Sequence, residues 1–222
     1  TQNQPVSFIP TAIRVAAGEE ATAVDLAQMV RDPEGADPAG FKYDISNLPE
    51  GVAISLDGHI LRVRADVDRP KGSVGSVTVS VDDGAGAVSA QIPITVVAST
   101  RPLIQVSDAL LEAARSGGLE AVDLTRYTIN PFPETPIRIV GASIQIGEGT
   151  VDPQGTNLNI TPAAGFRGQM TVRYRLMDAT GDPDRIVEGK VRLVVRDRRS
   201  DECLTDCDRP GQRAGDLPSG CR

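Results

Sequence analysis

Short runs of alternating apolar and polar residues recur along most of this chain. In Ser76–Val81 and Lys190–Val195, for example, Val or Leu occupies every second position. Side chains point alternately to the two faces of a strand, so a period of two predicts half-buried β-strands. Turn-forming residues separate these runs, and Asp57-Gly58 predicts a hairpin with a type I′ turn, in which both central residues have positive φ. The pattern therefore predicts an all-β protein.

The pattern also repeats along the chain. The string Ala-Val-Asp-Leu occurs at 23–26 and again, 98 residues later, at 121–124. Two turn-forming pairs, Asp32-Pro33 and Asn130-Pro131, follow the two strings at the same offset. Each copy contains about seven short strands in about 95 residues, which is typical of an immunoglobulin-like sandwich.

The repeat defines the domain organisation that we expect. We predict two tandem immunoglobulin-like β-sandwiches, over residues 1–98 and 101–197, followed by an irregular tail, 198–222, that is predicted to be disordered. The linker Ala98–Pro102 is short, and its proline fixes φ and restricts the residue before it. We therefore expect limited bending between the two sandwiches.

One segment has an alternative interpretation. Ser107–Arg115 combines good helix formers with a serine that can cap a helix, and Gly117-Gly118 follows as a stop signal. The repeat aligns this segment with Ile9–Ala17, where Pro10 and β-branched residues favour an extended path. Because propensity is a weak guide against tertiary context, we predict a strand here and allow for a single helical turn.

Composition excludes several classes of partner and chemistry. The net charge is −7, with 23 Lys and Arg against 30 Asp and Glu, and no basic block is present to bind nucleic acid phosphates. No apolar run reaches the roughly 20 residues of a spanning helix, so no membrane insertion is expected within this segment. The sequence does not begin with Met, and we expect it to be part of a longer polypeptide whose signal and anchor lie outside it.

Catalytic chemistry has little support in the sequence. The chain contains one histidine, His59, next to a predicted hairpin turn, where we expect its side chain to be exposed. A nucleophile–base–orienter triad would have to be built around this single residue. We therefore predict that the chain is not an enzyme, and we predict no cofactor and no catalytic residue.

The two copies resemble the tandem modules of large bacterial cell-surface proteins of the actinobacterial type. These modules are immunoglobulin-like, cadherin-like or fibronectin type III-like. The residues that carry the resemblance are Val24–Leu26, Asp32-Pro33, Ser80–Gly86, Val122–Leu124, Asn130–Pro133, Thr161–Phe166 and Tyr174–Pro183.

The resemblance implies a structural role outside the cell. It implies a non-enzymatic spacer segment of a bacterial surface or secreted protein, extracellular or attached to the cell envelope, with neighbouring modules of the same polypeptide as its partners. One alternative is an adhesin-type module that binds a host or cell-surface protein or a glycan, with or without the assistance of Ca²⁺. A third reading is an accessory domain of a secreted hydrolase.

Cadherin-like modules bind Ca²⁺ between domains through clustered carboxylates, and Ca²⁺ prefers oxygen ligands. The candidates for such a site are Asp32, Glu34, Asp37, Asp82 and Asp83. The linker itself contains no carboxylate and one cation, and aspartate before Pro or Gly is ordinary turn chemistry. We therefore predict no resident metal.

The loop Asn130–Pro136 is the candidate ligand-binding loop, with Asn130, Phe132 and Pro133 as its contact residues. Its prolines are rigid, and they either present Phe132 outward or hold it against the next module. Most of the other aromatic side chains are expected in the two cores.

All three cysteines, Cys203, Cys207 and Cys221, lie in the tail. A structural zinc site generally needs four N or S ligands, so zinc is not expected. A Cys203–Cys207 disulfide is sterically feasible and would leave Cys221 free for intermolecular pairing.

Overall fold

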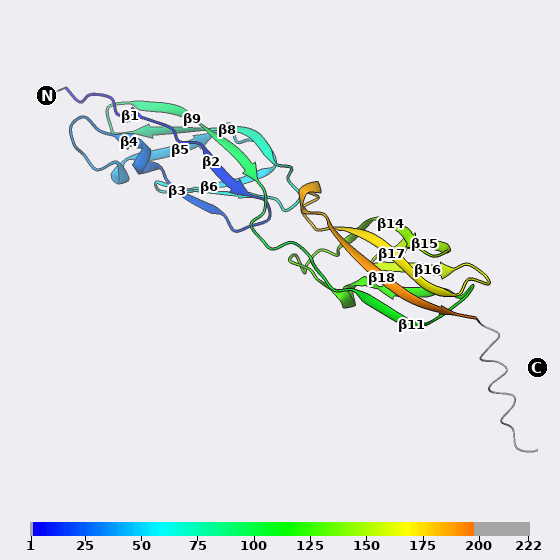
Figure 1. Ribbon diagram of the computed structural model, residues 1–222. Coiled ribbons are helices and arrows are strands. Elements are labelled where there is room, and N and C mark those ends of the chain that lie inside the picture. The colour runs from blue at the N-terminus through cyan, green and yellow to red at the C-terminus, as the bar shows by residue number, and fades with distance from the viewer. Residues whose placement is uncertain (1, 198–222) are drawn as a thin grey trace, which may run out of the picture. The chain divides into compact units, whose positions relative to one another are not determined.

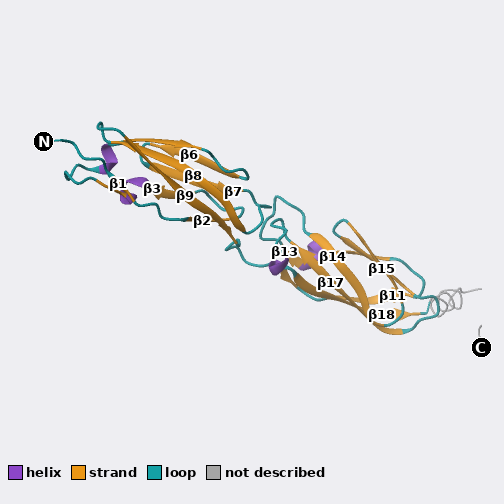
Figure 2. Cartoon of the chain, turned by 90° about the horizontal axis from the view of Figure 1, so that it is seen from above, coloured by secondary structure: helices purple, strands orange, loops and turns teal. Residues whose placement is uncertain are grey.

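Strands make up nearly all of the regular structure of this protein, as Figure 2 shows in orange. The computed structural model describes residues 2–197. Both alternating runs singled out above form strands: Ser76–Val81 lies in β8 and Lys190–Val195 in β18. The prediction of an all-β fold is confirmed.

The first sandwich has two sheets that pack face to face (Figure 1). A four-stranded sheet has the order β2-β9-β8-β5, a three-stranded sheet has the order β3-β7-β6, and the short strands β1 and β4 pair with each other. The elements are β1 (Ser7–Phe8), β2 (Ile13–Ala16), β3 (Thr22–Asp25), the 3₁₀ turn η1 (Leu26–Met29), β4 (Val30–Arg31), η2 (Pro38–Gly40), β5 (Lys42–Ser46), β6 (Val52–Asp57), β7 (Ile60–Ala65), β8 (Gly72–Asp82) and β9 (Ala87–Val97).

The second sandwich repeats this topology strand for strand. Its sheets have the orders β11-β18-β17-β14 and β12-β16-β15, and β10 pairs with β13. The elements are β10 (Gln105–Val106), β11 (Ala109–Arg115), β12 (Glu120–Asp123), η3 (Leu124–Tyr127), β13 (Thr128–Ile129), β14 (Arg138–Ile146), β15 (Gly149–Gln154), β16 (Asn157–Pro162), β17 (Gly168–Met177), η4 (Pro183–Arg185) and β18 (Val187–Arg196). The identical order confirms the prediction of two immunoglobulin-like sandwiches.

Each sandwich has its own apolar core, formed by the alternate residues that face inward from both sheets. The fully buried side chains of the first core include Val15, Leu26, Leu61, Ile92 and Ile94. Those of the second core include Leu124, Leu158, Ile160, Met170 and Tyr174. Burial of this apolar surface is the main term that stabilises each sandwich.

The repeated Ala-Val-Asp-Leu string has a structural explanation in both copies. The carboxylates of Asp25 and Asp123 each accept a hydrogen bond, 3.0 Å long, from the backbone N–H two residues later. Each aspartate thereby caps the short 3₁₀ turn that follows its strand. Leu26 and Leu124, the first residues of these turns, are fully buried. The motif therefore ends a strand and anchors the following turn in the core.

The hairpin at Asp57-Gly58 forms, but the predicted turn type is wrong. Asp57 is still in β6 and pairs with Ile60, so Gly58 and His59 are the two turn residues. Gly58 has φ +59°, whereas His59 is not among the described residues with positive φ. A positive φ at the first central residue alone is the type II′ pattern, which places glycine there.

The segment with helical propensity is a strand without a helical turn. Ala109–Arg115 forms β11, which pairs in parallel with β18 from Ala109↔Val191 to Arg115↔Arg196, with an irregularity between Leu111 and Ala114. Backbone pairing with a neighbouring strand outweighs the local helix preference of these residues.

The chain divides into two compact units whose bounds differ from the predicted 1–98 and 101–197. The first unit contains the residues up to Pro102 together with Ala179–Arg185, the segment that connects β17 to β18. The second contains Leu103–Asp178 and the described residues from Ile186 onward. The predicted tail, 198–222, with its three cysteines, lies outside the described residues.

Candidate functional site

The five carboxylates considered for Ca²⁺ are not brought together as a metal site. Among residues 2–197, no group of three His, Cys, Asp or Glu side chains gathers closely enough to hold a metal ion. Four of the five carboxylates accept hydrogen bonds from backbone N–H groups of their own turns: Asp32 from Ala36, Asp37 from Ala39, Asp82 from Gly84 and Asp83 from Ala85. Glu34 is exposed. These aspartates stabilise the turns in which they lie.

The candidate binding loop is closed on itself by hydrogen bonds. The Asn130 side chain accepts from the backbone N–H of Phe132 at 2.9 Å and donates to the carbonyl of Thr135 at 2.8 Å. Phe132 is buried, with 4% of its surface exposed, whereas Pro133 is exposed. A buried ring offers little surface to a ligand, so the structure does not present Phe132 outward.

His59 is not the exposed hairpin residue that the sequence predicted. Its Nδ1 lies 2.7 Å from Asp25 Oδ1, and its backbone carbonyl accepts the N–H of Leu26 at 2.8 Å. About a third of each of the two side chains is exposed. His59 therefore connects the β6–β7 hairpin to the capped turn η1, which is a structural role.

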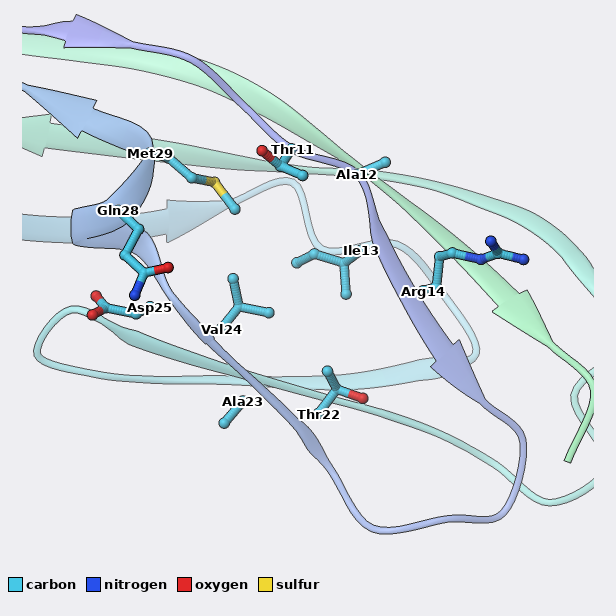
Figure 3. A pocket seen from close by; sticks show the side chains of 10 residues that line it. All are labelled: Thr11, Ala12, Ile13, Arg14, Thr22, Ala23, Val24, Asp25, Gln28 and Met29. Carbon is cyan, nitrogen blue, oxygen red and sulfur yellow. The ribbon is translucent and has the colours of Figure 1, made fainter. Parts of the chain in front are cut away.

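A groove of about 450 Å³ opens between β2 and β3 in the first sandwich (Figure 3). Both are edge strands, because β2 pairs with β9 alone and β3 with β7 alone within their sheets. In Figure 3 the side chains of Ile13 and Val24 point toward each other between the two strands. The groove therefore has an apolar floor between two strand edges.

Polar groups surround this floor. Thr11, Thr22 and Gln28 line the groove, as do two charged residues, Arg14 and Asp25. An unpaired strand edge offers backbone N–H and C=O groups to an added strand. The groove therefore has the chemistry to accept a short extended peptide, with hydrogen-bonding groups at its walls and apolar contact at its floor.

A polar network of the first unit surrounds the linker Ala98–Pro102. Glu19 Oε1 accepts hydrogen bonds from the Thr100 backbone N–H at 2.6 Å, from the Thr100 hydroxyl at 2.5 Å and from the Ser99 hydroxyl at 3.4 Å. The linker sequence contains no carboxylate, so one from the β2–β3 loop supplies the acceptor.

A cation binds the same linker from the segment Ala179–Arg185, which we call the linker-binding segment. The Arg185 guanidinium donates to the carbonyls of Ser99 at 3.2 Å, Arg101 at 2.9 Å and Pro102 at 2.8 Å. Arg185 is 6% exposed. Three acceptors from four consecutive residues thus converge on one buried charge.

Lys71 connects this segment to the rest of the first unit. Its Nζ lies 2.6 Å from Asp184 Oδ2 and 3.2 Å from Asp182 Oδ2. The hydrogen bond to Asp184 raises the pKa of Lys71, and the same bond lowers the pKa of Asp184. Both shifts favour the charged forms, so the contact is an ion pair.

Sequence reasoning missed the residues of this network: Glu19, Lys71, Thr100, Asp182, Asp184 and Arg185. Lys71 and Asp184 are separated by 113 positions, so no sequence spacing connects them. The available signal was the departure from the repeat: Asp178–Arg185 is a long, charged connection where the first copy has the tight turn Asp83–Gly86.

We expect the Glu19 contact to make the first unit less stable in acid. The Thr100 hydroxyl is the main cause of the lowered pKa of Glu19, whose ordinary value is 4.5. A lowered folded-state pKa contributes stability that is complete above the unfolded-state pKa and is lost as pH falls through the folded-state value. The measurement is thermal unfolding of the wild type and Glu19→Gln between about pH 6 and about pH 3.

The difference in stability between the wild type and Glu19→Gln is expected to be largest near pH 6 and to shrink as the pH falls below 4.5. Lys42→Gln, a change at an exposed residue on β5, is the control and is expected to show no such trend. A Glu19→Gln difference that is constant over the whole pH range would contradict this role.

No protein-family model and no curated protein matches this chain. Within residues 2–197, no helix is long and apolar enough to cross a membrane.

Several solved structures are similar to the chain at low identity. The titin domains Z1Z2 in complex with telethonin are 12% identical over 89% of this chain and 99% of the other, with a TM-score of 0.42. Drosophila N-cadherin EC1-3 is 15% identical over 88% of this chain and 69% of the other, with a TM-score of 0.33. An endo-fucoidan hydrolase of glycoside hydrolase family 107 is 15% identical over 86% of this chain, with a TM-score of 0.35. The chain spans 29% of that hydrolase.

Proposed function

We propose that this chain is a non-enzymatic, load-bearing spacer segment of a bacterial surface or secreted protein, extracellular or attached to the cell envelope. Its partners would be the neighbouring modules of the same polypeptide. The observation that carries the proposal is the parallel pairing of the early strand with the last strand in each sandwich.

This pairing involves backbone contacts in both sandwiches. In the first, β2 pairs in parallel with β9, from Ile13↔Ile94 to Ala16↔Val97. In the second, β11 pairs in parallel with β18, from Ala109↔Val191 to Arg115↔Arg196. The strands near the entry and the exit of each sandwich are therefore neighbours that run in the same direction.

The direction of the strands determines how they respond to a pull. A force applied to the chain ends pulls β2 from its first residue and β9 from its last, so the two parallel strands are pulled in opposite directions along their length. The hydrogen bonds between them are then loaded together, in shear. A pair loaded at one end opens one bond at a time instead. This topology suits a segment that transmits tension.

Single-molecule force spectroscopy tests the proposal. We expect end-to-end pulling of the full chain to show two unfolding steps, one per sandwich. The first sandwich would extend by at most about 330 Å, the fully extended length of the 91 residues from Ser7 to Val97. Attachment at Thr1 and at a cysteine introduced by Ala85→Cys, in the β8–β9 turn, would load the β2–β9 pair at one end. The unfolding force of the first sandwich is then expected to fall by about half or more, because the bonds break in sequence.

Equal unfolding forces in the two pulling geometries would overturn the load-bearing proposal. Ala85→Cys without attachment there is the matched control. Ala85 is exposed in its turn, so this variant is expected to unfold like the wild type when the chain ends are pulled.

An adhesin-type binding module is the second candidate function. The groove between β2 and β3 favours it, because it combines two free strand edges with an apolar floor. The loop Asn130–Pro136 supports it less, because Phe132 is buried. An accessory role beside a hydrolase has no support in the described residues beyond the fold.

A further inference from the structure

The linker-binding segment concentrates buried polar groups to an unusual degree. Six polar or charged residues are buried in the described chain, and four of them belong to the linker or to this segment: Ser99, Thr180, Asp182 and Arg185. Burying a charge is costly unless hydrogen bonds and a partner compensate it. Such a group is therefore kept in place only by a specific set of contacts.

Arg185 has such a set on the linker. Its planar guanidinium presents five N–H donors in a fixed arrangement, and it donates three hydrogen bonds to the carbonyls of Ser99, Arg101 and Pro102. Pro102 has no backbone N–H, so this end of the linker lacks one backbone hydrogen-bond donor. The guanidinium thus supplies a positive charge to a cluster of carbonyl oxygens, from within the chain.

The segment is held in its own conformation by local hydrogen bonds. Asp182 accepts from the backbone N–H of Asp184 at 3.0 Å through its carboxylate, and from that of Arg185 at 3.0 Å through its carbonyl. Thr180 accepts from the backbone N–H of Asp182 at 3.2 Å. These bonds form the turn η4 and orient Arg185 toward the linker.

The second attachment is of a different kind. The Lys71 side chain is 39% exposed. Of its two partners, Asp184 is 80% exposed and Asp182 is 8% exposed at the side chain. Ion pairs between exposed groups are weak and are screened by salt. The segment is therefore held by a buried attachment through Arg185 and by a second attachment through Lys71, whose exposed contact with Asp184 responds to ionic strength.

We propose that the linker-binding segment is a reversible latch of the first unit: Arg185 binds the carbonyls of the linker, and the ion pair of Lys71 with Asp182 and Asp184 makes the closed state sensitive to salt. When the latch is closed, the segment and the linker are protected from solvent and proteases. When it is open, both are exposed. This inference does not depend on the load-bearing function.

Limited proteolysis of the full chain with an endoproteinase that cuts before aspartate tests the latch. Cleavage before Asp182 or Asp184, identified by mass spectrometry, requires the segment to leave its site. We expect Arg185→Ala to raise the rate of this cleavage by about tenfold or more, because three charge-assisted hydrogen bonds are lost. Lys71→Gln is expected to raise it about two- to fivefold, as an exposed ion pair would.

Two comparisons make the test specific. Lys42→Gln removes an exposed lysine of the same unit that lies on β5, and it is expected to leave the cleavage rate unchanged. Raising the salt from about 50 mM to about 500 mM is expected to speed cleavage of the wild type but not of Lys71→Gln, with rates normalised to a reference peptide. Excess Ca²⁺ is expected to have no effect on the wild type.

The latch is overturned if Lys71→Gln is cleaved at the wild-type rate, or if Lys42→Gln is cleaved as fast as Lys71→Gln. Should Arg185→Ala fail to fold, Arg185→Lys replaces it. This variant keeps the charge without the planar donor set, and it is expected to be cleaved faster than the wild type. A wild-type cleavage rate for Arg185→Lys would contradict the assigned role of the guanidinium.

Discussion

Replacing Gly189 by alanine is expected to destabilise the second sandwich by about 3 kcal/mol, since overpacking a tight core forces side chains and backbone to move. Gly189 lies in β18 directly opposite Tyr174 of β17. A Cβ atom at Gly189 would overlap the end of the Tyr174 side chain and would lie 2.6 Å from Val106 Cγ1. The Tyr174 ring is fully buried, so it has no free space into which it can move.

The corresponding pair in the first sandwich shows why the glycine is needed. There Val79 pairs with Ala90, and the smaller valine leaves room for a methyl group. The glycine therefore compensates for the tyrosine. For a domain of this size, the loss predicted for Gly189→Ala corresponds to a fall of roughly 10–20 °C in Tm. Calorimetry of the full chain measures it, and hydrogen exchange assigns the transition to the second sandwich.

Tyr174→Phe provides the matched control for this prediction. The Tyr174 hydroxyl is buried without a hydrogen-bond partner among the described residues, and burial raises its pKa to about 12. Removing an unsatisfied hydroxyl is expected to cost little. In the Gly189→Ala background it should recover part of the lost stability, because the closest clash is with that oxygen. Additive effects of the two changes would contradict a direct steric conflict.

Truncating Leu26 to alanine is expected to cost about 2–5 kcal/mol, as for other buried leucines, because it removes apolar contacts and leaves a cavity. Leu26 is fully buried in the first core and begins the turn η1, next to the Asp25 cap. Both the packing of the first core and the seating of the capped turn η1 therefore depend on the Leu26 side chain. Urea unfolding followed by circular dichroism measures the loss.

Leu48→Ala is the control for Leu26→Ala, since Leu48 lies in the same unit and is 52% exposed. Its truncation is expected to change stability by less than about 0.5 kcal/mol, as is usual for surface substitutions. Comparable losses for the two variants would show that Leu26 is not an anchor of the core.

Much of the fold could be predicted from the sequence because its signals are local or periodic. The alternation in Ser76–Val81 places three valines on one face of β8, and all three are fully buried. The Ala-Val-Asp-Leu repeat marked equivalent positions in two sandwiches, and those positions have the same cap and the same buried leucine. Two local details were wrong. The turn at Gly58-His59 lies one residue later than predicted, and His59 is paired with Asp25.

The candidate sites were less predictable, because their residues come together only in the folded chain. Sequence reasoning considered Asp32 and Asp83 as ligands, but it could not show that each bonds its own turn. It recognised Phe132 as a candidate contact, but it could not decide that the ring is buried. Side-chain burial depends on neighbours that are distant in sequence.

For this protein, the alternation of residue types and the repeat determined the number of sandwiches, the strands and most of the core, since strand faces and turns depend on neighbours a few positions away. Only the tertiary structure decided that Ala109–Arg115, which the repeat already predicted as a strand, contains no helical turn, because the β11–β18 pairing overrides its helix propensity. It also decided that Glu19 and Arg185 bind one linker and that Lys71 binds the segment that carries Arg185. Contacts across as many as 113 positions depend on the path of the backbone, which no local pattern encodes.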